Sequence, residues 1–338
     1  MPTAHPLLII LNPNAAKGGA HNRRQAIEEY FASRDIPFKL VLTKQPLDGI
    51  KLAKEGVLEG YKTVVAAGGD GTLNEVVDGI TRAMREGEIA PEDGPVVGQI
   101  PIGRGNDFAF AANIPRKLEE ACALIAEGKW YPTDYGELFG GKFPEGRCFI
   151  NGVGVGVEPT VNFIASDFKR VGGMLSYFLA FIKMLKRFPL PVKLNVKSAE
   201  KTFEVESQQL SICNGRRMGS AFIMGPNAII DDGKLDIVYA NGPIKRHSIL
   251  KYVFKFFSGT QLKTERFSQF LTTEITVEAN GDLLPVHCDG EEVSRGCNFL
   301  KVVLFPKGVK IIRKIWVIIW LMPNLVVLFI VHVSVFFS

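Results

Sequence analysis

The chain has 338 residues, of which 46% are hydrophobic and 22% are charged, and its formal net charge is +5. These proportions are typical of a folded protein and exclude wholesale disorder, and the length suits two domains rather than one ordinary core. The mildly basic charge gives modest support for contact with an anionic membrane surface. Because basic and aromatic residues do not alternate in one stripe, we expect no nucleic acid partner.

The cysteines and histidines form no metal-binding pattern. There are five of each, they are scattered along the chain, and no two cysteines have the spacing of a metal-ligand pair. We therefore expect no zinc site, and we expect reduced, mostly buried thiols in a cytoplasmic protein. The N-terminus lacks the basic segment of a signal peptide, and the apolar run at residues 7–11 is too short for a signal-peptide core. This run predicts a strand.

The first third of the chain alternates short apolar runs with segments of helical spacing. Continuous apolar runs are typical of parallel strands that are covered on both faces, and their alternation with helices predicts a doubly wound parallel sheet. In such a sheet, ligands bind beyond the carboxyl ends of the strands. The expected strands are residues 7–11, 38–42, 63–67 and 96–100, and the expected helices include residues 47–58 and 118–126.

A glycine-rich turn, Gly68-Gly69-Asp70-Gly71-Thr72, follows the third expected strand. Because glycine has no Cβ atom, such a turn can adopt positive φ, and its backbone N–H groups can approach a phosphate closely. Thr72 lies near the start of the next helix, where free N–H groups favour anions. Asp70 would repel a phosphate unless a cation lay between them, which makes Asp70 a candidate magnesium partner. The structural alternative is a plain glycine turn with an aspartate cap.

Polar or glycine-rich segments follow the other expected strands as well. Asn12 follows the first strand, Thr43 the second, and residues 103–107 the fourth, so a parallel sheet gathers them with residues 68–74 at one edge. Each segment alone could be an ordinary turn. Their joint occurrence predicts a nucleotide-binding site.

Three of these segments resemble a known enzyme family. The sequences LNPNAAKG (residues 11–18), GGDGT (68–72) and PIGRGNDF (101–108) together look like motifs of the diacylglycerol and sphingosine lipid-kinase family. GGDGT alone is also similar to the signature of NAD kinases and 6-phosphofructokinases. The resemblance extends over residues 7–312. It implies an α/β, doubly wound N-terminal domain of the phosphofructokinase and NAD-kinase type, followed by an antiparallel β-sandwich-like C-terminal domain.

The resemblance also implies which residues contact ATP, namely Asn12, Thr43, Gly69, Thr72 and the loop that begins at Gly103. Arg104 stands where the family more often has threonine, which leaves open a hydroxyl contact at this position. The full set of candidate nucleotide-binding residues is Asn12, Pro13, Asn14, Thr43, Gly68, Gly69, Asp70, Gly71, Thr72, Asn74, Gly103, Arg104, Asn106 and Asp107.

From Trp130 onward, short segments of alternating hydrophobicity replace the earlier pattern and predict antiparallel strands. We expect an ATP-binding domain at residues 1–128 and a β-rich lipid-substrate domain at residues 129–312, with last strands that return toward the first domain in the family's chain course. The expected strands of the second domain are residues 148–157, 192–197, 202–212, 235–238, 273–277 and 300–305.

A helical insertion at residues 161–188 interrupts the strand pattern with aromatic, aliphatic and basic residues. One interpretation is a pair of core helices with solvated lysines and arginines. The other is an acyl-chain site whose basic residues contact anionic headgroups. The two interpretations are compatible.

An Asp-Asp-Gly turn at residues 231–233 could be no more than a corner between two strands. In the resembling family, this turn holds a magnesium ion through an aspartate and neighbouring backbone carbonyls. The candidate metal ligands are therefore Asp232, Ile229 and Lys234, in addition to Asp70 in the glycine-rich turn. We expect the ion at Asp232 to be structural, and hard oxygen ligands suit magnesium rather than a soft metal.

The segment Asp289-Gly290-Glu291 carries the candidate catalytic residues. Phosphoryl transfer to an alcohol needs a carboxylate near the hydroxyl group to accept its proton, and the family resemblance assigns this task to the Asp-Gly-Glu element. Asp289 and Glu291 share one face of an extended segment, so both can point at the same cleft. The sequence does not separate base from supporting carboxylate, and a plain hairpin turn is the structural alternative.

The tail at residues 313–338 lies outside the resemblance. Residues 315–338 contain no charged side chain, and as a helix they are long enough to cross an apolar layer of about 30 Å. Basic residues before this segment would keep the rest of the chain on the cytoplasmic side. Because Pro323 interrupts the run, interfacial or protein-buried packing is the alternative to a membrane anchor.

Together these features predict a cytoplasmic, membrane-associated lipid kinase that uses ATP and Mg²⁺ to phosphorylate a primary hydroxyl group of diacylglycerol or a related lipid. The expected partners are the lipid substrate and a membrane surface. The alternatives are an NAD-kinase-like or other small-molecule kinase and a non-catalytic lipid- or nucleotide-binding regulator. The sequence leaves open the identity of the lipid acceptor and the oligomeric state, including a homodimer.

Overall fold

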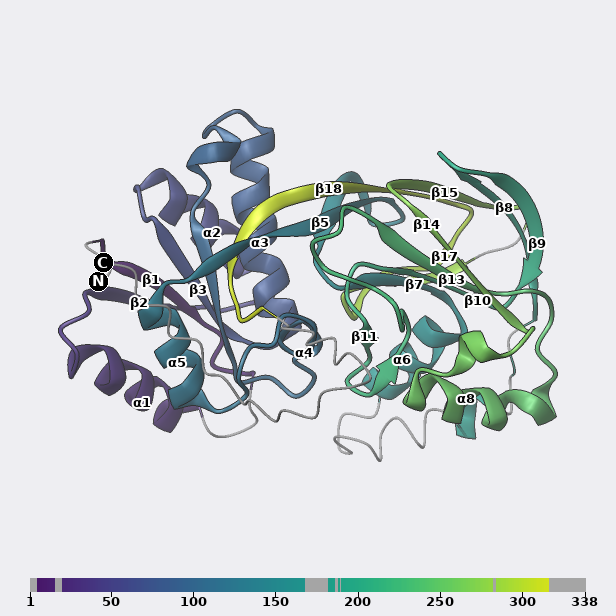
Figure 1. The fold of residues 1–338 in the computed structure, drawn as a ribbon, viewed down its shortest axis with the longest axis horizontal. Helices are drawn as coiled ribbons and strands as arrows, with labels where there is room; N and C mark the ends of the chain where they lie inside the picture. Colours follow the sequence, from purple (N-terminus) through teal and green to yellow (C-terminus); the bar gives the residue numbers. More distant parts are fainter. Residues whose placement is uncertain are drawn as a thin grey trace, which may run out of the picture.

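The computed structural model describes residues 5–15, 20–167, 182–185, 188, 190–281 and 284–315. One end of the molecule contains parallel strands between helices, and the other contains two antiparallel sheets that face each other (Figure 1). This arrangement confirms the predicted fold class, an α/β region followed by a β-sandwich-like region.

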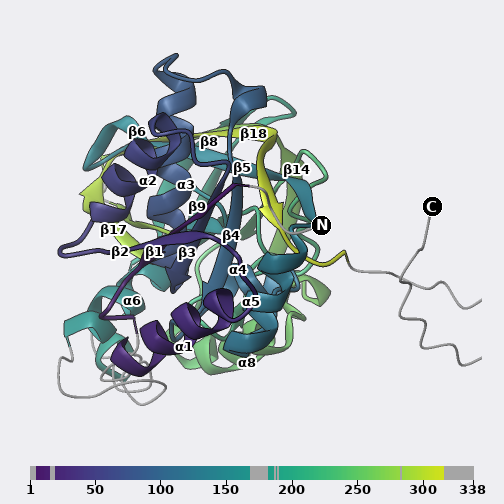
Figure 2. The ribbon, with the colours of Figure 1, turned by 90° about the vertical axis from the view of Figure 1, so that its left-hand side faces the viewer.

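The first region is built on four parallel strands in the order β2-β1-β3-β4. The inner strands β1 and β3 are buried along their whole length, because α2 and α3 cover one face of the sheet and α1 and α5 the other (Figures 1 and 2). The strands are β1 (Leu7–Leu11), β2 (Phe38–Leu42), β3 (Thr63–Gly68) and β4 (Val96–Pro101). The helices are α1 (Ala20–Ala32), α2 (Asp48–Leu58), α3 (Asp70–Arg85), η1 (Pro91–Asp93), α4 (Asp107–Ala111) and α5 (Leu118–Glu127).

The second region is a sandwich. Its six-stranded sheet, β14-β13-β10-β7-β16-β17, faces the antiparallel part of the other sheet, and aliphatic side chains from both sheets fill the space between them. The six strands are β7 (Gly152–Gly156), β10 (Gln209–Cys213), β13 (Leu235–Ala240), β14 (Phe267–Thr272), β16 (Leu284–Cys288) and β17 (Glu291–Cys297). The opposing strands are β5 (Trp130–Gly140), β6 (Phe143–Phe149), β8 (Val192–Ser198), β9 (Thr202–Ser207), β15 (Glu274–Ala279) and β18 (Phe299–Ile312).

Strand β18 joins the two regions into one ten-stranded sheet. Its first part pairs antiparallel with β15, and its last residues, Lys310 and Ile311, pair parallel with Val96 and Val97 of β4. β18 runs across the molecule from the sandwich to the α/β region (Figure 1). Since one sheet runs through both regions, the domain boundaries at residues 128 and 312 stay predictions.

Smaller elements surround the sandwich. Helix α6 begins at Val157, before the predicted helical insertion, and extends into it. Of this insertion, the structure describes only residues 161–167, 182–185 and 188. Helix α8 was not predicted. The remaining elements are α6 (Val157–Asp167), β11 (Arg217–Met218), β12 (Phe222–Ile223), η2 (Arg246–Ser248), α8 (Ile249–Ser258) and η3 (Gln261–Lys263).

Two of the long predicted strands are each interrupted near the middle in the structure, so these two predictions were wrong there. The expected strand 148–157 is divided between β6 and β7, because the backbone N–H groups of Ile150, Asn151 and Gly152 donate to the Asp289 carboxylate instead of to a neighbouring strand. The expected strand 202–212 is divided between β9 and β10, which belong to different sheets.

Of the predicted tail at residues 313–338, residues 316–338 lie outside the described residues. Within the part of the chain that the structure describes, no helix has both the length and the apolar composition needed to cross a membrane.

Asp236 on β13 gives a stability prediction. It is 1% exposed, its Oδ1 accepts from Gln269, and its Oδ2 has no partner among the described residues. Burial, with the nearby Asp232 carboxylate, raises the pKa of Asp236 to about 7. Because this pKa lies above that of the unfolded chain, Asp236 stabilises the fold below about pH 4, and this contribution is lost as the pH rises through 7.

Asp236→Asn should therefore raise the free energy of unfolding at pH 8 by about 2–4 kcal/mol and change it little at pH 4.5. Urea denaturation of both proteins at the two pH values, without metal ions, measures the difference. Asp93→Asn is the control because Asp93 is exposed on η1. An equal effect of Asp236→Asn at both pH values would contradict the prediction.

Candidate functional site

The glycine loops that follow β3 and β4 lie against each other. Ile102 N and Gly103 N donate to Gly68 O at 3.0 and 3.2 Å. A Cβ atom on Gly103 would lie 2.3 Å from Gly69 Cα, so only glycine permits this approach. Gly69 is the N-cap of α3 and Asp70 opens the helix. The two loops therefore form a glycine-lined edge beside the N-terminus of a long helix, which suits a phosphate.

Asn12 and Thr72 lie together at the same edge. Asn12 Nδ2 donates to Thr72 Oγ1 at 3.3 Å, and Asn12 Oδ1 accepts from Asn14 N at 2.9 Å. Thr43 is buried at the end of β2, with its N–H bonded to Leu11 O. The strand ends thus bring together the first three predicted segments, while Asn14 is exposed after Pro13.

The loop after β4 is held by its own asparagine. Asn106 adopts a left-handed backbone with φ of 53°, and its Nδ2 donates to Pro101 O and Gly103 O at 3.0 and 2.9 Å. Its buried Oδ1 has no hydrogen-bond partner among the described residues, so it can accept from a ligand. Arg104 is exposed.

Arg217 fastens this loop to the sandwich. Its Nε donates to Asp107 Oδ1 at 2.7 Å, and its Nη2 donates to the carbonyls of Gly105 and Asn106, each at 3.1 Å. Ser220 N donates to the other Asp107 oxygen at 2.8 Å. Asp107 is therefore a link between α4 and β11, and sequence reasoning missed Arg217 because a lone arginine has no characteristic spacing.

Replacing Arg217 by lysine should weaken the predicted ATP binding about tenfold, because an ammonium group cannot reproduce the planar set of three hydrogen bonds. Titration calorimetry of both proteins measures the dissociation constant. Arg216→Lys is a matched control, since Arg216 is exposed and, among the described residues, its side chain bonds only to Pro226 O. Equal ATP affinities for Arg217→Lys and the unmodified chain would contradict this role.

Asp70 lies among other carboxylates. Its Oδ1 accepts from Phe108 N at 3.0 Å. Burial, together with the Asp107 and Asp289 carboxylates, raises the pKa of Asp70 to about 6. This concentration of negative charge beside a phosphate-binding edge favours a bound cation. Among the described residues, no three His, Cys, Asp or Glu side chains could hold a metal by themselves, so Mg²⁺ here would need phosphate oxygens or water as further ligands.

Asp289 lies in the turn between β16 and β17, with a left-handed φ of 46°. Its carboxylate accepts from four N–H donors: Asn74 Nδ2 at 3.0 Å, Ile150 N at 2.9 Å, Asn151 N at 3.0 Å and Gly152 N at 2.8 Å. Loss of water raises the pKa of Asp289, and these donors oppose the rise. Four donors occupy the acceptor sites of a carboxylate, so Asp289 fixes the turn. Asn74, a predicted nucleotide ligand, also donates to Cys148 O at 2.7 Å.

Glu291 follows this turn as the first residue of β17, and one of its oxygens has no hydrogen-bond partner among the described residues. Its Oε2 accepts from Arg147 Nη2 at 2.9 Å, and the buried Arg147 also contacts Asp78 of α3 at 2.6 Å. Its Oε1 lies 3.5 Å from the position of a Cβ on Gly71, so it faces the first glycine loop. Burial raises the pKa of Glu291, and Arg147 opposes the rise. Sequence reasoning missed Arg147 and Asp78.

The buried His287 stabilises the turn at residues 289–290 between β16 and β17. His287 Nε2 lies 2.8 Å from Glu158 Oε1, and its Nδ1 accepts from Gly290 N at 3.2 Å. Although burial lowers the pKa of His287, the Glu158 carboxylate raises it above the ordinary value. Asn162 Nδ2 of α6 donates to Gly290 O at 2.9 Å. Gly290 is thus held through both its N–H and its carbonyl group.

The predicted structural metal residues lie at a separate turn before β13. Asp232 Oδ1 accepts from Lys234 N at 3.0 Å, and Ile229 is exposed. Burial, with Asp134 and Asp231 nearby, raises the pKa of Asp232. A carboxylate and backbone carbonyls in an acidic environment fit a hard cation such as Mg²⁺. The binding of a metal at this turn stays a prediction.

Comparisons with known proteins agree with this geometry. Residues 6–138 match the model of the diacylglycerol kinase catalytic domain, and residues 151–313 match that of the YegS C-terminal NAD kinase beta sandwich-like domain. A probable lipid kinase YegS-like from Xanthomonas euvesicatoria is 36% identical over 60% of this chain, and the match spans only 64% of that relative's length.

Two further relatives extend the comparison. A diacylglycerol kinase from Bacillus subtilis is 31% identical over 68% of this chain and 72% of its own length. The crystal structure of a putative diacylglycerol kinase from Bacillus anthracis has a TM-score of 0.74 at 22% identity, over 92% of this chain and 95% of that one. The last comparison bears on the fold alone.

Proposed function

Because this chain belongs to the lipid kinase family that includes YegS-like proteins and diacylglycerol kinases, we propose that it phosphorylates the primary hydroxyl group of diacylglycerol or a related lipid with Mg-ATP. One observation carries the proposal. The uncommitted oxygen of Glu291 faces Gly71, so a carboxylate of the sandwich region lies opposite a phosphate-binding loop of the α/β region. This arrangement supports phosphoryl transfer to an alcohol, which needs a carboxylate near the hydroxyl group and close to the bound phosphates.

The glycine loops would hold the ATP phosphates. Backbone N–H groups at the start of α3 point toward the edge where Gly69 and Gly103 meet, and the helix dipole favours negative charge there. Asp70 and the phosphates would both be ligands of Mg²⁺. When bound, this ion would neutralise negative charge on the transferred phosphoryl group. Arg217 keeps the second loop closed through the carbonyls of Gly105 and Asn106.

Glu291 is our candidate for the group that accepts the proton of the lipid hydroxyl. A general base needs a free acceptor oxygen within reach of the proton that it removes. Among the described residues, Glu291 Oε1 has no hydrogen-bond partner, whereas both oxygens of Asp289 are occupied by N–H donors. Asp289 would therefore act as a positioning residue that holds Glu291 opposite the glycine loop.

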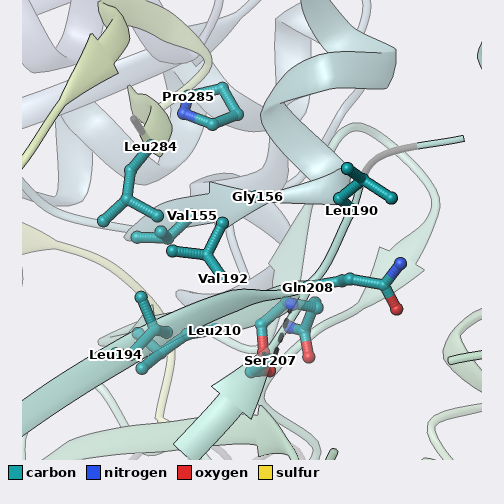
Figure 3. Close-up of a pocket in the computed structure, with 11 residues that line it drawn as sticks. Val155, Gly156, Leu190, Val192, Leu194, Ser207, Gln208, Leu210, Leu284 and Pro285 are labelled. Atoms are coloured by element: carbon teal, nitrogen blue, oxygen red, sulfur yellow. Dashed lines mark hydrogen bonds between the residues drawn. The ribbon is translucent and has the colours of Figure 1, made fainter. Parts of the chain in front are cut away.

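An apolar cavity supports the proposal that the acceptor is a lipid. The cavity has a volume of about 300 Å³ and lies between strands of the sandwich, where Val155, Val192, Leu194, Leu210 and Leu284 line it (Figure 3). Leu284 and Asp289 are five residues apart along β16 and its turn, which corresponds to about 17 Å of extended chain. We propose that a hydrocarbon chain of the acceptor occupies this cavity while its hydroxyl group reaches the turn.

A transfer assay tests the proposal. The full chain is incubated with Mg²⁺ and [γ-³²P]ATP, and with mixed micelles of diacylglycerol, ceramide or sphingosine in separate reactions. NAD replaces the lipid in a further reaction, since NAD kinases share the GGDGT signature. We expect a labelled phospholipid that is absent with Asp289→Asn. Labelled NADP, or no transfer to any acceptor, would contradict a lipid kinase.

A further inference from the structure

Helix α8 presents an apolar stripe to solvent. Leu250, Phe254 and Phe257 are 51%, 68% and 39% exposed, and their spacing of four and three residues places them on one face of the helix. A second face buries Ile249 and Phe256 against the sandwich region, and the Phe257 ring stacks on Phe222 of β12 with ring centroids 4.5 Å apart. Packing within the chain therefore accounts for the buried face of α8 and for part of Phe257, and it leaves the exposure of Leu250 and Phe254 unexplained.

Basic side chains border this stripe. Residues 241–264 contain five lysines and arginines, one histidine and no acidic residue. Lys251 and Lys255 follow Leu250 and Phe254 by one position, so they lie along one edge of the stripe, and Lys245 and Arg246 precede the helix. Within the described part of the chain, none of these four residues forms an ion pair.

We propose that the exposed face of α8 docks on an anionic bilayer, with Leu250 and Phe254 inserted among the lipid chains and the neighbouring lysines on the headgroups. Apolar and cationic side chains side by side are what an anionic membrane interface binds. A second copy of the chain is a poorer occupant, because a symmetric contact would bring the basic edges of two helices together. An uncharged protein groove would leave the lysines without partners.

The position of α8 agrees with this role. Helices α6 and α8 lie at the same end of the sandwich in both views (Figures 1 and 2). Through Asn162, α6 contacts the turn that carries Asp289 and Glu291. A hollow of about 460 Å³ lies next to the stripe, where Leu185, Ile249 and Leu250 lie beside Arg246 and His247. Such a hollow offers apolar and cationic groups together, as a lipid with an anionic headgroup requires.

An environment-sensitive dye tests the inference directly. In a Cys297→Ser background, which removes the one partly exposed cysteine, an NBD dye is attached at Phe254→Cys. Leu58→Cys is the matched control, because Leu58 at the end of α2 is 51% exposed. With phosphatidylglycerol vesicles, we expect a several-fold fluorescence gain at position 254 that nitroxide-labelled lipids quench, and no gain at position 58. No gain at 254, or equal gains at both positions, would overturn the inference.

Binding of the full chain to vesicles provides the second readout. Lys251→Gln with Lys255→Gln should lower the apparent partition coefficient on phosphatidylglycerol vesicles about tenfold or more. The exposed Lys62 and Lys193, replaced together by glutamine, serve as the control. If Phe254→Ser instead dissociates an oligomer in sedimentation, the occupant is a second copy and the inference fails. These measurements contain no nucleotide, so they do not depend on the proposed kinase activity.

Discussion

Glu291→Gln is expected to lower the rate of lipid phosphorylation by roughly 100- to 10,000-fold, the range typical for the loss of a general base. The amide has nearly the same shape but cannot accept a proton from the lipid hydroxyl group. Because Glu291 is partly exposed and only its Oε2 forms an ion pair, thermal stability should change little. Initial rates with [γ-³²P]ATP and diacylglycerol, together with a thermal melt of each protein, measure both effects.

The neighbouring Glu292 provides a matched control. It is also partly exposed, but it pairs with Lys142 and Arg295 on the outer surface instead of facing the glycine loop. Glu292→Gln should therefore keep the unmodified rate. Loss of a general base lowers the rate far more than about threefold. If Glu291→Gln keeps a rate within about threefold of the unmodified chain, Glu291 is not the proton acceptor.

Gly103→Ala is expected to weaken ATP binding at least about a hundredfold, equivalent to about 3 kcal/mol. The new Cβ would lie 2.3 Å from Gly69 Cα and 3.0 Å from Gly69 N. Both are backbone atoms of the phosphate-binding loop and cannot rotate away, so the two glycine loops must separate. Titration calorimetry with ATP and Mg²⁺ measures the loss.

Gly98→Ala separates this effect from a general loss of stability. Gly98 lies five residues earlier, inside β4, and a Cβ there would meet the Ile125 and Val65 side chains at 3.1 and 3.3 Å. Side chains can shift by this amount, so Gly98→Ala should cost some stability and retain ATP affinity. Unchanged affinity in Gly103→Ala would mean that ATP does not need the contact between the loops.

The α/β region could be predicted because its signals are local. Each parallel strand is a short, mostly apolar run with a polar or glycine-rich segment after it, and the four predicted strands appear as β1 to β4 within one residue. The strand break at Ile150 and Asn151 could not be predicted in this way. It depends on the Asp289 carboxylate, which lies 139 and 138 residues away in the chain.

The same difference between local signals and long-range contacts applies to the candidate site. The glycine loops were identified because a close backbone approach requires glycine at those positions, and this requirement is visible in the sequence. Arg147 and Arg217 were missed because their partners Glu291 and Asp107 are 144 and 110 residues away. The stripe on α8 was visible in principle, since Leu250, Phe254 and Phe257 have helical spacing, but only the exposure of these residues distinguishes a surface stripe from a buried one.

The most direct test of the account follows the transferred atoms. The full chain is given diacylglycerol and ATP whose γ-phosphoryl oxygens are ¹⁸O, and the lipid product is examined by mass spectrometry. Transfer to the lipid hydroxyl predicts a phosphomonoester with three ¹⁸O atoms from ATP and one ¹⁶O atom from the lipid. The yield of this product should fall steeply in Glu291→Gln. Heavy inorganic phosphate without any phosphorylated lipid would contradict a lipid kinase acting on diacylglycerol.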